Sequence, residues 1–355
     1  EKFARKALDL DSKNIEAQRV LGLVLSVNPT LVVASEAVNY LKQVVTSLSG
    51  ATDSQVQFNL GRLYLLTGDF AGAIEVLQQL IVQRPYFSQA RLMLARAQKA
   101  AGLNDAAIVT LESVEYVDTR PYNQFQLYST LGQYYDDANR WASAAEAYAQ
   151  ALAVNPEDRD LRIRRASMLL ALSGRDNASQ ALNVLRPLFE RNRLDTNALY
   201  LQSQAYRSLG DLFQAEQVAR EMLTLEPNSQ RGAYALSQVL NQGHRYQDVI
   251  DYLEGFLALP SSNGKASIGL FSYLAYAYQV LGNYDKAIEV FSQAKKVTPD
   301  SPSFDVAIIQ ASLAAKRYAA ALDRAVEAQT QYPQDQRFLQ LQARALLYSG
   351  DSLRA

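Results

Sequence analysis

Apolar residues recur along the chain with the three- and four-residue spacing of amphipathic helices. The clearest example covers residues 54–87, SQVQFNLGRLYLLTGDFAGAIEVLQQLIVQRPYF. Gly68 predicts a turn between two helices, and Pro85 predicts the end of the second. Each helix gathers apolar and small residues on one face: Leu60, Gly61 and Tyr64 on the first, and Ala73, Leu77 and Leu80 on the second. This hairpin has an apolar face that it cannot bury alone.

The hairpin pattern repeats along the whole chain at a spacing of about 34 residues. Half of the prolines fall at the same place in the repeat: Pro85, Pro156, Pro227, Pro299 and Pro333. We therefore predict a single array with partial repeats over 1–14 and 336–355. The complete repeats cover 15–53, 54–87, 88–121, 125–158, 159–195, 196–229, 230–267, 268–301 and 302–335. Because neither end resembles a polar cap, we expect the native protein to continue in both directions.

Two repeats carry a recognisable motif, with small, aromatic and proline residues at fixed places. They are Gln57-Leu60-Gly61-Tyr64-Ala73-Leu77-Pro85 and Tyr128-Leu131-Gly132-Tyr135-Ala144-Tyr148-Ala151-Pro156. This motif resembles that of the tetratricopeptide repeat family. The resemblance implies an all-α fold, a right-handed α-solenoid (superhelix) of stacked antiparallel helical hairpins. Weaker repeats depart from the motif: Ser237 and Ile309 stand where the family prefers glycine or alanine, and Arg165 where it prefers leucine.

Local chemistry predicts where helices end and where loops lengthen. Glycines suited to the left-handed conformation are followed by capping residues, as in Gly68-Asp69, Gly210-Asp211 and Gly282-Asn283. Insertions predict longer turns at 26–35 and 173–179, and extra residues between repeats at 49–53, 120–123 and 260–265. The segment 260–265, Pro-Ser-Ser-Asn-Gly-Lys, is the best candidate for a flexible joint or a merely tolerated surface loop.

Composition excludes several kinds of function. The chain of 355 residues has a formal net charge of −1, which argues against a nucleic-acid partner. It has no cysteine and one histidine, His244, so thiolate metal sites and most histidine-dependent catalysis are excluded. No apolar run approaches the ~20 residues of a membrane span. We expect no cofactor, no metal and no enzymatic activity.

The resemblance implies that the first helix of each repeat lines a concave groove. A carboxylate clamp of the kind found in some family members is not supported, because Leu23 stands where the clamp needs asparagine. Amide, tyrosine and arginine side chains instead suit the backbone and carboxylates of an extended peptide. The alternative explanation is that these positions are polar simply because they face water and have no role in binding. The candidate groove residues are Arg62, Arg96, Asn197, Tyr200, Gln204, Arg207, Arg231, Tyr234, Gln238, Asn241, Tyr276 and Gln279.

Together these patterns predict a protein–protein interaction scaffold that binds polypeptide segments, with a mild preference for acidic ligands. The alternative is a substrate-recognition or regulatory arm of a larger enzyme whose catalytic domain lies elsewhere. Self-association through uncapped repeat ends is a further expectation. The composition is compatible with a bacterial protein of the cytoplasm or the periplasm, and the sequence leaves both the compartment and the partner open.

Overall fold

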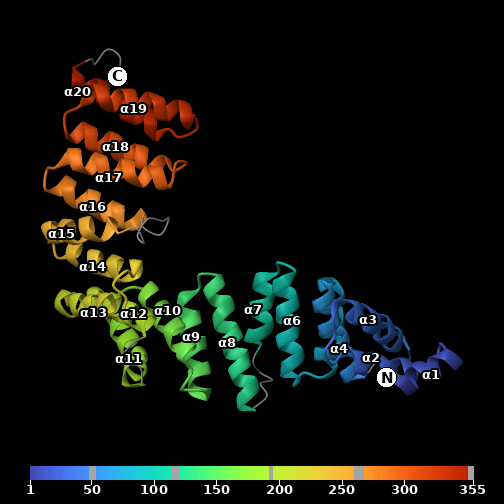
Figure 1. Cartoon of the computed structure of the whole chain (residues 1–355). Helices are drawn as coiled ribbons and strands as arrows, with labels where there is room; N and C mark the ends of the chain where they lie inside the picture. Colours follow the sequence, from blue (N-terminus) through green and yellow to red (C-terminus); the bar gives the residue numbers. More distant parts are fainter. Residues whose placement is uncertain (48–52, 114–119, 192–194, 260–267, 351–355) are drawn as a thin grey trace. The chain divides into compact units, whose positions relative to one another are not determined.

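The structure is a computed structural model that describes residues 1–47, 53–113, 120–191, 195–259 and 268–350. These residues form 20 α-helices, and no strand occurs among them (Figure 1). The all-α prediction is confirmed. The chain divides into two compact units, Glu1–Leu172 and Ser173–Ala355, and each is described by itself.

In the first unit, each helix packs against the next along the chain, so that successive hairpins stack side by side (Figure 1). Alternate helices, such as α4 and α6, also touch. The helices are α1 (Lys2–Leu10), α2 (Ile15–Leu25), α3 (Leu31–Thr46), α4 (Ser54–Thr67), α5 (Phe70–Gln83), α6 (Ser88–Ala100), α7 (Asn104–Glu112), α8 (Pro121–Asp137), α9 (Trp141–Val154) and α10 (Arg159–Ala171).

The second unit has the same construction. Its helices α12, α14 and α16 touch in turn, as do α18 and α20. The helices are α11 (Arg175–Arg191), α12 (Thr196–Leu209), α13 (Leu212–Leu225), α14 (Gln230–Gln242), α15 (Tyr246–Leu257), α16 (Ile268–Val280), α17 (Tyr284–Val297), α18 (Pro302–Ala314), α19 (Tyr318–Gln331) and α20 (Arg337–Ser349).

The turns within hairpins have the predicted capping chemistry. Gly68 ends α4 in the left-handed conformation at φ 84°, and Asp69 caps α5 by accepting a hydrogen bond from the Gly72 N–H at 2.9 Å. Gly210 and Asp211 do the same between α12 and α13. His244 takes a left-handed φ of 56° in the turn before α15, at the place that Gly68 and Gly210 occupy in their repeats. Its role there is conformational.

Several hairpins close on a small side chain from one helix and a large one from the other. A Cβ added to Gly61 would lie 2.6 Å from Leu77 Cγ, and one added to Gly132 would lie 2.6 Å from the Tyr148 ring. At the equivalent position of a weaker repeat, Ile309 is 0% exposed and shares a cluster with Ala325. The departure of Ile309 from the family preference is therefore compensated, because the large side chain has moved to the opposite helix.

Serine fills the same position in two repeats by satisfying its own hydroxyl. Ser203 is buried and donates to the Ala215 carbonyl of the opposite helix at 2.9 Å. Ser237 is buried and donates to the Ala233 carbonyl of its own helix at 2.8 Å. A buried hydroxyl with a partner avoids the desolvation penalty that an unpaired one would carry.

Several insertions lengthen helices instead of loops. The turn predicted at 173–179 is mostly helical, because α11 begins at Arg175 and runs for 17 residues. The extra residues predicted at 120–123 are also helical from Pro121, which occupies the first position of α8 without needing an N–H partner. By contrast, α7 has only 9 residues. The predicted joint 260–265 lies outside the described residues.

A buried carboxylate links three helices of the second unit. Asp305 on α18 is 1% exposed. It accepts hydrogen bonds from Arg324 on α19 at 2.8 and 3.0 Å, and its other oxygen pairs with Lys295 on α17. Two cations therefore compensate one buried charge, as a dry interior requires.

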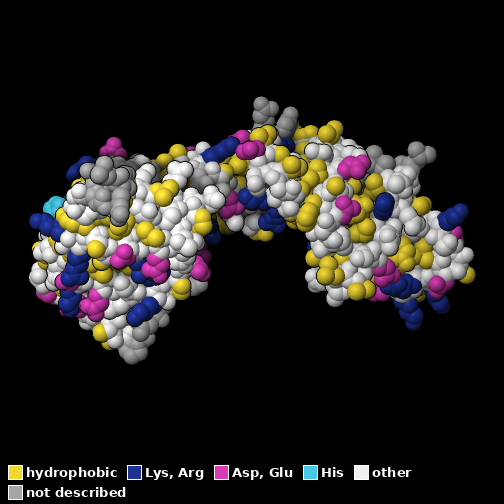
Figure 2. Space-filling model, turned by 90° about the horizontal axis from the view of Figure 1, so that it is seen from above, with side chains coloured by type: hydrophobic (Ala, Val, Ile, Leu, Met, Phe, Trp, Pro, Cys, Tyr) yellow, Lys and Arg dark blue, Asp and Glu magenta, His cyan; other side chains and the backbone are white. Residues whose placement is uncertain are grey.

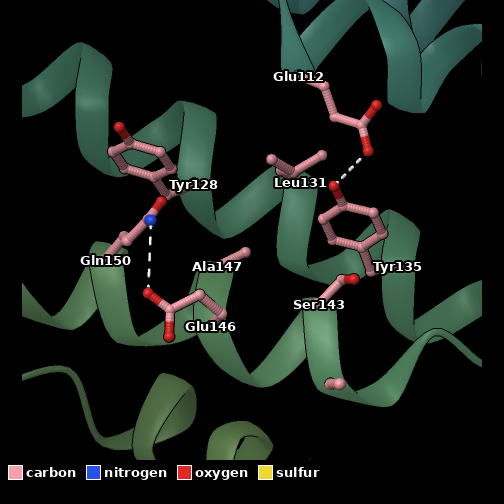
Figure 3. Close-up of a pocket in the computed structure, with 9 residues that line it drawn as sticks. Glu112, Tyr128, Leu131, Tyr135, Ser143, Glu146, Ala147 and Gln150 are labelled. Carbon is pink, nitrogen blue, oxygen red and sulfur yellow. Dashed lines mark hydrogen bonds between the residues drawn. The ribbon is translucent and has the colours of Figure 1, made fainter. Parts of the chain in front are cut away.

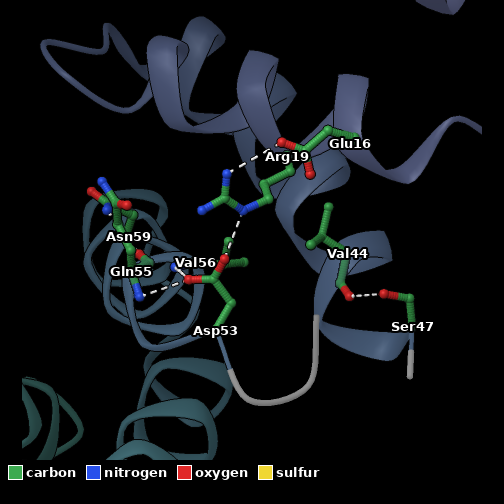
Figure 4. Close-up of polar contacts among 8 residues, drawn as sticks. All are labelled: Glu16, Arg19, Val44, Ser47, Asp53, Gln55, Val56 and Asn59. Carbon is green, nitrogen blue, oxygen red and sulfur yellow. Dashed lines mark hydrogen bonds and ion pairs between the residues drawn. The ribbon is translucent and has the colours of Figure 1, made fainter. Parts of the chain in front are cut away.

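A second ion pair joins successive repeats in the first unit (Figure 4). Asp53 caps α4 by accepting from the backbone of Gln55 and Val56 at 3.0 and 3.2 Å. The same carboxylate accepts from Arg19 on α2 at 2.7 Å. Partial burial opposes ionisation, but the hydrogen bonds from Arg19 and the Val56 N–H outweigh it and lower the pKa of Asp53.

The close approach at Gly61 predicts opposite effects of two glycine-to-alanine changes. Gly61→Ala should lower the free energy of unfolding by about 1–3 kcal/mol, because Leu77 must move. Gly255→Ala, in a helix where an added Cβ meets nothing within 4 Å, should raise it by about 0.5–1 kcal/mol. Urea unfolding followed by circular dichroism measures both. Equal effects of the two changes would contradict the packing described.

The Asp53–Arg19 pair predicts a pH-dependent contribution to stability. A lowered carboxyl pKa stabilises the folded state above the unfolded value of about 3.9, and this contribution disappears as the pH falls through the folded pKa. Asp53→Asn keeps a good capping residue but removes the charge. The variant should be about 1 kcal/mol less stable than the original protein at pH 7, with the difference shrinking at pH 2.5.

Thermal unfolding at both pH values measures this difference. The control is Asp105→Asn, which removes an exposed partner of Arg140 and should change stability by less than about 0.5 kcal/mol. A difference for Asp53→Asn that is the same at both pH values would refute the ion-pair account.

Candidate protein-binding surfaces

The first helices of the second unit bring most of the candidate residues together. Helix α12 carries Asn197, Tyr200, Gln204 and Arg207, and α14, which packs against it, carries Arg231, Tyr234, Gln238 and Asn241. Helix α16 follows with Tyr276 and Gln279. We call this set of side chains on α12, α14 and α16 the first-helix surface.

Side chains at equivalent places in neighbouring repeats bind one another across this surface. Arg231 donates to the Asn197 side chain, and its guanidinium lies 5.3 Å from the centre of the Tyr200 ring. Gln204 donates to Gln238 at 3.4 Å. Arg207 donates to the side chain of Gln242 at 3.1 Å, and Gln242 returns a bond to the Arg207 carbonyl at 3.3 Å. The result is a polar ladder that orders the surface before any ligand arrives.

Tyrosine rings pack between the ladder and the hydrophobic core of the unit. Tyr200 and Tyr234 are half-buried and pack against the core of the unit. Tyr234 meets Tyr273 edge to face at 5.4 Å, and burial raises the pKa of Tyr200 and of Tyr273. These phenols are therefore neutral donors at physiological pH. Sequence reasoning missed Tyr273 and Gln242, whose helical positions differ by one residue from the positions assigned to the groove.

The remaining candidates of the second unit have fewer partners. Tyr276 is 45% exposed and contacts the Tyr246 ring at 6.0 Å. Gln279 is half-buried. Asn241 Oδ1 and Arg207 Nε are buried without a hydrogen-bond partner. These two atoms are therefore unsatisfied within the ladder and are shielded from a ligand by the side chains around them.

In the first unit, the two candidate arginines flank an apolar cavity of about 440 Å³. Arg62 on α4 is held in place by the Ser26 carbonyl and by Asn59 Oδ1, the latter at 3.3 Å. Arg96 on α6 is exposed. The rest of the lining is apolar: Pro29, Leu63, Leu65, Leu66 and Met93. Pro29 comes from the lengthened turn after α2, which sequence reasoning did not connect with this site.

A second cavity, of about 520 Å³, lies between α8 and α9 (Figure 3). Leu131 and Ala147 are part of its lining, and Tyr128 and Tyr135 contribute rings. The Tyr135 hydroxyl donates to Glu112 Oε1 at 2.5 Å, and burial together with this bond raises the pKa of Tyr135 to about 12. In the sequence both tyrosines are positions of the repeat motif, and neither was expected to line a cavity.

In the described part of the chain, no group of three or more His, Asp or Glu side chains is placed to hold a metal ion. The ring of His244 is exposed, and its Nδ1 lies 2.9 Å from the Tyr246 hydroxyl. Within the same residues, no helix has both the length and the apolar character needed to cross a membrane.

Many basic side chains of the described residues are paired with acidic ones. On the face shown in Figure 2, basic side chains lie close to acidic ones in each unit. Several of these neighbours form ion pairs, such as Arg140 with Asp105 at 2.9 Å and Arg317 with Asp285 at 2.6 Å. This pattern does not resemble the basic stripe of a nucleic-acid interface.

Family models identify this architecture. Three tetratricopeptide repeat models match the chain, one over residues 64–122, one over 269–301, and one over 34–86, 129–176 and 170–231. The chain belongs to the tetratricopeptide repeat family. This fold typically mediates protein interactions and typically carries no catalytic site. No curated protein matches the sequence.

Solved structures of similar helical arrays were also found. One is a chain of the structure of Naa15/Naa10 bound to HypK-THB, at 18% identity and a TM-score of 0.44, covering 99% of this chain and 58% of that one. The chain thus spans less than two thirds of that relative. Another is a tetratricopeptide repeat protein from Parabacteroides merdae, at 13% identity and a TM-score of 0.49, covering 72% of this chain and 97% of that one.

Proposed function

We propose that the chain is a non-enzymatic scaffold that binds an extended polypeptide along its first helices. The observation that carries the proposal is the convergence of polar and aromatic side chains from α12, α14 and α16 on one contiguous surface. The ladder holds these side chains in place before a ligand binds. The side chains of the surface would therefore lose less conformational entropy on binding.

The chemistry of this surface suits a peptide backbone. Amide side chains such as Gln204 and Gln238 offer both a donor and an acceptor, the two groups that each peptide unit presents. The exposed ring of Tyr276 adds rigid contact area at low entropic cost.

The preferred ligand carries acidic residues. Arg207 and Arg231 are bound to neutral amide partners, Gln242 and Asn197, so their charges stay available to a carboxylate. In the first unit, Arg62 and Arg96 stand beside an apolar cavity. A segment that combines acidic and apolar side chains would suit this second site by itself.

In a second candidate function, the same surface would bind the substrate of a larger enzyme. The chain would be the substrate-recognition arm of an enzyme with a separate catalytic domain. The limited share of the Naa15/Naa10 chain that it covers is compatible with this role. Self-association through repeat ends and a bacterial source stay predictions.

Charge reversal tests the proposed surface. Affinity capture with the immobilised chain, followed by mass spectrometry, first identifies a partner. We expect Arg207→Glu with Arg231→Glu to weaken binding of that partner at least about tenfold, because two charge-assisted hydrogen bonds become repulsive. Fluorescence titration with the partner measures the change.

The matched control is Lys296→Glu. It reverses an exposed charge in the same unit on α17, which is the second helix of its hairpin and lies outside the first-helix surface. It should leave the affinity unchanged. Equal losses for both variants, or no loss for either, would contradict the assignment of the surface. Circular dichroism confirms that each variant keeps its helices.

A further inference from the structure

The cavity between α8 and α9 does not belong to the first-helix surface. It lies on the helix faces that the sequence pattern assigned to the core. Its polar lining is acidic at both ends, with Glu112 at one and Glu146 at the other (Figure 3). Among the described residues that line it, none is basic.

The cavity lies beside α7, which is a short helix for the second position of a hairpin. Helix α7 ends after 9 residues at Glu112, whereas α5, α9, α13, α17 and α19 each have 14. Tyr128 on α8 occupies a position that is buried in other repeats, as Leu199 (2% exposed) and Phe271 (5% exposed) show. Tyr128 itself is only half-buried.

The second unit supplies an internal comparison. Between α12 and α13 the equivalent cavity measures about 270 Å³, against about 520 Å³ here. There Leu199, Tyr206, Gln217 and Glu221 take the places of Tyr128, Tyr135, Glu146 and Gln150. Phe189 from the 17-residue α11 also lines that smaller cavity. The long helix α11 thus precedes the smaller cavity, between α12 and α13. The short helix α7 precedes the larger cavity, between α8 and α9, which has a second carboxylate.

The polar groups of the larger cavity are held in place but not saturated. Glu112 accepts from the Tyr135 hydroxyl at 2.5 Å, and Glu146 accepts from Gln150 at 3.5 Å. A carboxylate has about four acceptor positions, so each retains capacity for a ligand. Nearby cations act from outside the lining: Arg165 interacts electrostatically with Glu146, and Arg140 pairs with Asp105 at 2.9 Å.

We propose that this cavity binds a lysine or arginine side chain of a protein partner. One of the two carboxylates would receive the charged head, and the other would add to the negative potential of the cavity. The rings of Tyr128 and Tyr135 would contact the cation and its aliphatic stem. The site would act independently of the first-helix surface, and it selects the opposite charge.

Methyl nuclear magnetic resonance with labelled alanine and valine tests the site directly. The probe is N-acetyl-arginine amide, and its uncharged comparison is N-acetyl-norleucine amide. We expect the arginine probe to shift the methyl signals of Ala142 and Ala147, which line the cavity. Its dissociation constant should be on the order of 10 mM, as for a ligand of this size. The norleucine probe should bind at least about tenfold more weakly.

Two variants and one matched control complete the test. Glu146→Gln and Glu112→Gln should each weaken binding of the arginine probe by about fivefold or more. Glu221→Gln removes a carboxylate from the equivalent cavity of the second unit and should change nothing. Unshifted methyl signals elsewhere in the chain show that each variant is folded.

Three results would overturn the proposal: equal binding of the two probes, unchanged affinity in both glutamate variants, or no shift of Ala142 and Ala147 at saturating probe. Arg207→Glu with Arg231→Glu should leave binding of the arginine probe intact. Failure of the first-helix surface and failure of this cavity are therefore distinguishable.

Discussion

The structure depends on the close approach of two helices that cannot bury their apolar faces alone. In several hairpins a small side chain on one helix admits a large one from the other, as Gly61 admits Leu77 and Gly132 admits Tyr148. Where the small residue is lost, the partner shrinks, as with Ile309 and Ala325. A large side chain on one helix is thus accommodated by a small one opposite it, because packed interiors tolerate exchange of volume between neighbours better than overpacking.

This constraint separates structural from functional residues. Most of each apolar face is buried against neighbouring helices, so side chains that point away from the core are the main candidates for specificity. On α12 and α14 these side chains first bind one another, as Arg231 binds Asn197 and Gln204 binds Gln238. The same repetition that stacks the hairpins therefore also lines up and orders a candidate binding surface.

The repetition also explains what could be predicted from the sequence. Gly68, Asp69 and Pro85 have local roles, so their spacing predicted the helix ends. The hydrogen bonds of the ladder across α12 and α14 join side chains 34 residues apart, so the sequence predicted which residues share a surface but not which of them bind one another. Tyr273 was missed because it lies one residue away from the positions assigned to the groove. The cavity beside Tyr128 was missed because α7 ends early, whereas the repeat pattern predicts a helix of ordinary length.

Hydrogen exchange with a double-mutant cycle at one hairpin tests the central claim most directly. Gly61→Ile should strongly reduce protection in α4 and α5, and adding Leu77→Ala should restore part of it, because the pair then copies Ile309 and Ala325. The loss should extend to neighbouring hairpins and fade beyond them, since repeats contact only their neighbours. Additive losses in the double variant, or a uniform loss of protection along the whole chain, would contradict the account.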